Sequence, residues 1–200
     1  MVAVLVALAA LVSMASPAPA ATTNVTWDIT GHITTHWDGV TRVINSGTSI
    51  CVPPASGNPT VVTHINDATG AVHINGAGAY GGFDPADINI AGTNYQAQIS
   101  GGTTTQAGTL NAATDTAHIT VTLNVTIRNC AGTTTLCTFH VHLPLTGHNY
   151  TGGLTPATGD SVTLAGSASN PISPAIGCNV AIRPTILNST VSGLIHLTAH

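Results

Sequence analysis

The chain has 200 residues, of which ten carry a fixed charge: three arginines and seven aspartates, for a formal net charge of −4. Lysine and glutamate are absent, whereas a typical intracellular domain has about a quarter of its residues charged. Three arginines far apart in sequence cannot form the cationic cluster that displaces counterions from phosphates, so the composition excludes a nucleic-acid-binding protein.

The first twenty residues have the pattern of a secretory signal peptide. An unbroken apolar run covers residues 2–12, and small residues follow it, which predicts cleavage after Ala20. No basic residue precedes the run. A membrane-spanning helix needs about 20 apolar residues, and the run is shorter than that. We therefore expect residues 1–20 to be a signal peptide. Residues 21–200 should form a single domain without a membrane span, secreted outside the cell or to the cell envelope.

The mature chain alternates apolar and polar residues with a period of two, which is typical of strands with one buried face. The clearest case is 117–127, where Ile119 and Val121 alternate with His118 and Thr120. Glycine and proline separate such segments at short intervals, and no window shows a helical stripe. We predict an all-β fold, a single antiparallel β-sandwich or β-barrel of about 9–12 strands joined by short hairpins. In chain order, the predicted strands are 25–29, 32–36, 40–44, 61–65, 71–75, 95–100, 117–127, 137–143, 161–165, 179–183 and 191–198.

Four cysteines in an exported chain predict two disulfides. Cys130 and Cys137 enclose six turn-forming residues between two predicted strands, so we expect them to pair with each other. That pairing leaves Cys51 to bond with Cys178. Four thiols allow three connectivities, and the absence of a Cys-x-x-Cys motif argues against a metal site made from these residues.

Ten histidines are the only abundant groups able to bind a metal. His140 and His142 occupy the polar face of one predicted strand, about 7 Å apart along the backbone. His118, on the polar face of another strand, could complete a Zn²⁺ or Cu²⁺ site. The competing interpretation is that polar faces collect histidine when lysine and glutamate are missing.

Two further segments carry candidate ligands. As a strand, residues 32–38 place His32, His36 and Asp38 on one face, where a carboxylate could orient a metal-bound imidazole. Residues 83–89 contain two aspartates and an asparagine, whose oxygens suit Ca²⁺, although a proline-containing turn explains the same residues.

Enzyme signatures are missing from the sequence. Without glutamate there is no His-Glu-x-x-His motif, without lysine there is no P-loop, and no Gly-x-Ser-x-Gly elbow occurs. We therefore expect a non-catalytic protein that acts at the cell envelope or extracellularly as an adhesive or structural component. Its expected partners are cell-wall polymer or further copies of itself, since charges that normally prevent edge-to-edge pairing are scarce.

Two other functions stay open from the sequence. One is a metal-binding module that uses the clustered histidines to hold Zn²⁺ or Cu²⁺; no other cofactor is expected. The other is a binder of lipid or another apolar ligand, which would need a cavity inside a β-barrel.

Overall fold

The structure is a computed structural model that describes part of the chain, and the fold below refers to the described residues alone. The described residues are 20–35, 41–43, 51, 57–76, 79–82, 85–90, 92–101, 105–169, 178 and 190–200. The predicted signal peptide, apart from Ala20, and the predicted strand at 179–183 therefore lie outside the described residues.

Twelve strands and no α-helix make up the described residues, which confirms the predicted all-β fold. Several predicted strands are parts of longer ones, and three strands near the middle of the chain were not predicted. The strands are β1 (Thr22–Thr35), β2 (Thr41–Val43), β3 (Thr60–Asn66), β4 (Ala71–Asn75), β5 (Tyr80–Gly81), β6 (Ala86–Ile90), β7 (Thr93–Gly101), β8 (Thr105–Asn111), β9 (Thr116–Asn129), β10 (Thr135–His148), β11 (Ser161–Ser169) and β12 (Thr190–Ala199).

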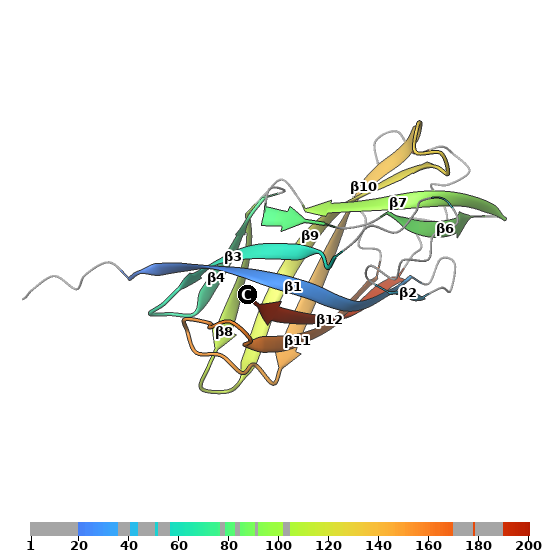
Figure 1. Ribbon diagram of the computed structural model, residues 1–200. Coiled ribbons are helices and arrows are strands. Elements are labelled where there is room, and N and C mark those ends of the chain that lie inside the picture. Colours follow the sequence, from blue (N-terminus) through green and yellow to red (C-terminus); the bar gives the residue numbers. More distant parts are fainter. Residues whose placement is uncertain are drawn as a thin grey trace, which may run out of the picture.

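All of these strands belong to one antiparallel sheet, and eight of them close it into a barrel. The order around the ring is β10-β11-β12-β1-β3-β4-β8-β9, and pairing between β9 and β10 joins its two ends. Figure 1 shows β1, β12 and β11 side by side, with the paired β9 and β10 running across them at a steep angle. Closure gives each of these eight strands a partner on both sides, which reduces the free edges that an open sheet would expose.

The four remaining strands extend the barrel at its margins. The first half of β9 pairs with β8, whereas its second half pairs with β7, which in turn pairs with β6. The short strands β2 and β5 pair with β1 and β3 respectively. The long strand β9 therefore belongs both to the barrel and to a separate extension formed by β7 and β6 (Figure 1).

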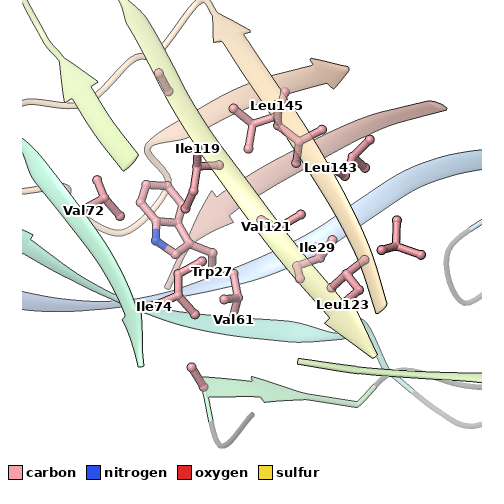
Figure 2. Packing of buried hydrophobic residues seen from close by; sticks show 14 of the residues in the cluster. Trp27, Ile29, Val61, Val72, Ile74, Ile119, Val121, Leu123, Leu143 and Leu145 are labelled. Carbon is pink, nitrogen blue, oxygen red and sulfur yellow. The ribbon is translucent and has the colours of Figure 1, made fainter. Parts of the chain in front are cut away.

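The period-two pattern of the sequence separates the inside of the barrel from its outside. Along β10, every second residue from Cys137 to Leu145 is buried, and the residues between them are exposed. The buried residues of β9 face those of β10, so that Val121 lies opposite Leu143. Figure 2 shows these aliphatic side chains meeting Trp27 and Ile29 in the interior. Burial of apolar surface is the main force that stabilises this core.

A glycine explains why the predicted strands 25–29 and 32–36 form the single strand β1. Gly31 has a φ of 116°, and a Cβ at this position would lie 2.2 Å from the carbonyl oxygen of Leu194 on β12. Only glycine tolerates both conditions, so Gly31 allows the pairing of β1 with β12 to continue from Trp27 to Thr35.

One end of the barrel is covered by the connection between β10 and β11, residues 149–160. Tyr150 belongs to the core cluster and is 2% exposed, and its backbone N–H donates to the carbonyl of Asp115 in the β8–β9 turn. Leu154 lies against Gly70 in the β3–β4 turn, where a Cβ would come within 3.0 Å of the leucine Cδ2. This connection therefore joins turns from different parts of the ring.

The two predicted disulfides are present, but their predicted pairing is wrong. Cys51 bonds to Cys130 and Cys137 bonds to Cys178, with Cα–Cα distances of 4.7 and 4.3 Å. The register of the β9–β10 hairpin explains the difference, because Cys137 lies opposite Ile127, whereas Cys130 follows the end of β9. Cys137 also faces the interior, where it is 2% exposed. Its side chain is therefore not directed toward Cys130 across the turn.

Within the described part of the chain, there is no helix of the length and apolar character needed to cross a membrane.

Candidate functional site

The interior of the barrel contains a cavity of about 80 Å³. Its walls are apolar, and each of the eight strands of the ring contributes at least one lining residue. Among them are Trp27 of β1, Ile74 of β4, Val121 of β9 and Leu197 of β12. Figure 2 shows several of these side chains pointing toward one another between the strands. An eight-stranded barrel has an interior that side chains nearly fill or that holds one small ligand, and this cavity fits that range.

The polar groups next to the cavity are satisfied by other protein groups. The indole Nε1–H of Trp27 donates to the hydroxyl of Thr63 at 2.8 Å, and both residues are buried. The Thr63 hydroxyl in turn donates to the carbonyl of Val25 at 3.5 Å. An unpaired polar group in such a place would cost free energy, so this pairing keeps the indole in an apolar wall.

A second buried polar group lies at the side of the cavity near β5. The hydroxyl of Tyr80 donates to Gln106 Oε1 at 2.6 Å, and Gln106 Nε2 donates to the carbonyl of Thr122 at 3.0 Å. Burial raises the pKa of Tyr80 far above its usual value, against the opposing effect of the Gln106 hydrogen bond. The phenol is therefore neutral at physiological pH. Gly101 makes room for its ring, since a Cβ there would lie 2.0 Å from Tyr80 Cδ2.

Five imidazole rings on the described outer face of the barrel follow a common arrangement. In each case Nδ1 contacts an oxygen of the residue directly opposite on a neighbouring strand. His142 contacts Thr122 at 3.0 Å, and His196 contacts Thr163 at 3.0 Å. This contact fixes the ring at Nδ1 and leaves Nε2 available for other interactions. The same Nδ1 contact joins three further cross-strand pairs: His140 with Asn124, His118 with Thr146 and His64 with Asn24.

The structure does not bring the three predicted metal ligands of β9 and β10 together. His118, His140 and His142 share the outer face, as the sequence predicts, and all three are exposed. His118 lies opposite Thr146, which is four residues beyond His142 along β10, a separation of about 13 Å. Among the described residues, no group of three or more histidines, cysteines or acidic residues is placed to hold a metal ion.

The other predicted ligand sets fall partly outside the described residues. His32 lies on β1 opposite Leu194, whereas His36 and Asp38 are not described. In the segment proposed for Ca²⁺, residues 83 and 84 are not described, and the Asp87 carboxylate accepts a hydrogen bond from the backbone N–H of Cys51 at 3.1 Å. This contact holds Asp87 near the Cys51–Cys130 disulfide.

Sequence reasoning missed both polar pairs next to the cavity. Trp27 and Thr63 are 36 residues apart, and Tyr80 and Gln106 are 26 residues apart, so no local pattern connects them. One signal was available, because Thr63 interrupts the apolar face of its strand between Val61 and Ile65.

Comparisons with models of protein families, with curated proteins and with solved structures found no match for this chain.

Proposed function

We propose that this protein is an exported, non-catalytic binding protein that holds a small apolar group inside its barrel. The observation that supports the proposal is the cavity of about 80 Å³, lined by apolar side chains from all eight strands of the ring. An engineered apolar cavity of about 150 Å³ in another protein stays dry and binds benzene or xenon, so apolar walls of this kind suit a small apolar ligand. Two disulfides are compatible with an extracellular site of action.

The size of the cavity limits the ligand. Pockets that enclose drug-sized molecules have volumes of about 300–1,000 Å³, several times larger than this interior. A whole lipid is therefore a poor fit. A small hydrocarbon, or the apolar end of a larger molecule, suits the space better.

Benzene is a suitable probe for this proposal. We expect benzene to shift the amide resonances of residues that line the cavity, including Trp27 and Val121, and to raise the melting temperature. Ala117 is a buried lining residue, so Ala117→Leu should fill part of the cavity and abolish both effects. Thr120→Leu adds an apolar side chain to the exposed face of the same strand and serves as the control. If a saturating concentration of benzene changes neither the amide resonances nor the melting temperature, the proposal is rejected.

A second candidate function is adhesion at the cell envelope, and the outer face of β9 and β10 favours it. Exposed and half-buried positions there carry threonine, histidine and asparagine, and cross-strand contacts such as His142 with Thr122 order them. Such a face suits hydrogen bonding to a cell-wall polymer. Thr120→Asp should weaken co-sedimentation with purified wall polymer while Ala117→Leu leaves it unchanged. Equal binding by both variants would count against adhesion through this face.

A further inference from the structure

Two histidines lie opposite each other on the outside of the β3–β4 hairpin. His64 of β3 lies directly opposite His73 of β4, and the next pair toward the turn is Ile65 with Val72. Because Ile65 and Val72 are buried, both imidazoles belong to the outer face. Directly opposite residues of antiparallel strands have Cβ atoms about 4.5–5.5 Å apart. The two rings are thus within reach of one shared ion.

The ring of His64 has a fixed orientation. Its Nδ1 lies 2.6 Å from Oδ1 of Asn24, the residue directly opposite on β1. An amide oxygen only accepts hydrogen bonds, so a neutral His64 ring with this partner donates from Nδ1 and keeps the lone pair of Nε2. Metal-binding histidines in proteins are oriented in the same way, by a carbonyl or carboxylate that accepts from the other ring nitrogen.

This hairpin differs from the rest of the outer face. His118, His142 and His196 have the same Nδ1 contact, but each faces a threonine across the strand. Among the described strand pairs, His64 and His73 are the histidines that lie directly opposite each other. Two imidazoles on paired strands can bind one ion with little loss of conformational freedom, because the sheet already fixes their backbones.

We propose that His64 and His73 together bind a divalent transition-metal ion, with Asn24 as a positioning residue. Neutral imidazole nitrogen is a ligand that Cu²⁺ and Zn²⁺ both favour, with distances of about 2.0–2.1 Å for Zn²⁺. Water or a group from another molecule completes the coordination, since no third histidine, cysteine or acidic residue joins them among the described residues. Affinity follows the general order for divalent ions, so Cu²⁺ binds more tightly than Zn²⁺.

Calorimetric titration of the untagged protein with CuCl₂ and with ZnCl₂ tests this site. We expect one ion per chain, and His73→Gln or His64→Gln should each reduce the affinity at least about tenfold, the effect expected when a metal site loses a supporting group. His118→Gln is the matched control, because His118 has the same type of Nδ1 contact and faces threonine. Unchanged affinity in His73→Gln, or an equal loss in His118→Gln, would overturn the proposal.

The role of Asn24 needs a separate comparison. Asn24→Ala removes the acceptor and should weaken metal binding about tenfold, whereas Asn24→Asp restores an acceptor for Nδ1 and should recover the affinity. Broadening of the His64 and His73 resonances by substoichiometric Cu²⁺ locates the ion independently of affinity. If the broadening instead centres on His140 and His142, the site assignment is wrong. Circular dichroism confirms that each exposed-face variant is folded.

Discussion

The inner and outer faces of β9 and β10 differ sharply although the same two strands form them. The inner face carries aliphatic residues such as Leu143, which is fully buried, and the outer face carries threonine, asparagine and histidine. Adjacent residues such as His142 and Leu143 therefore have different surroundings. Because side chains alternate strictly along a strand, substitutions on one face can leave the other face intact. Binding in the interior and binding on the surface can thus be tested separately.

The largest expected effect contrasts these two neighbours directly. Leu143→Ala should lower the free energy of unfolding by about 2–5 kcal/mol, because it leaves a cavity in a packed interior. His142→Ala removes an exposed side chain and should change it by no more than about 1 kcal/mol. Urea denaturation of both variants measures the difference. Similar values for the two variants would contradict the assignment of the inner and outer faces.

A threonine on the inner face gives the next comparison. Thr63→Val removes the hydroxyl that accepts from Trp27 Nε1 and leaves a buried donor unpaired, which should cost about 1–3 kcal/mol. Thr120→Val makes the same chemical change on the exposed face and should alter stability by about 0.5 kcal/mol or less. Denaturation curves measured side by side decide whether burial of the hydroxyl is responsible.

Alkaline pH should destabilise the interior through Tyr150. Burial, together with the nearby Asp160 carboxylate, raises the pKa of Tyr150 to about 12 from its ordinary value of 10.0. Between these values the unfolded chain loses the phenol proton while the folded protein retains it, so stability falls as the pH rises. Tyr150→Phe should make the decline between pH 10 and pH 11 shallower. An identical decline in the variant would show that Tyr150 does not cause it.

The smallest expected effect concerns one cross-strand pair of the outer face. A double-mutant cycle with Thr163→Ala and His196→Ala should give a coupling energy of about 0.2–1 kcal/mol, as for other cross-strand pairs. A coupling above this range would mean that the outer face contributes to stability more than its exposure suggests.

The sequence predicts the strands best where apolar and polar residues alternate without interruption. The segment 117–127 lies within β9, and its inward and outward residues are assigned correctly. Strand β8 was missed because its inner face includes Gln106, a polar residue that becomes buried only through Tyr80 and the Thr122 carbonyl. Those partners come from β5 and β9, so the pattern of β8 alone does not reveal its burial.

The candidate sites were harder to predict than the strands. The alternation placed His118, His140 and His142 on the outer face, but their separation depends on the register of β9 against β10. The cavity depends on how eight inner faces meet after closure of the ring, which no single strand encodes. The disulfide pairing failed for the same reason, since Cys51 and Cys178 come from connections whose positions depend on the whole fold.

The disulfide connectivity has a consequence for biogenesis. Cys51 and Cys130 are the first two cysteines along the chain, and Cys137 and Cys178 are the last two. The native bonds therefore join consecutive cysteines, and the segment that each encloses is separate from the other. A chain that crosses a membrane from its N-terminus and is oxidised as it emerges would reach the correct bonds in order, without an isomerase to reshuffle them.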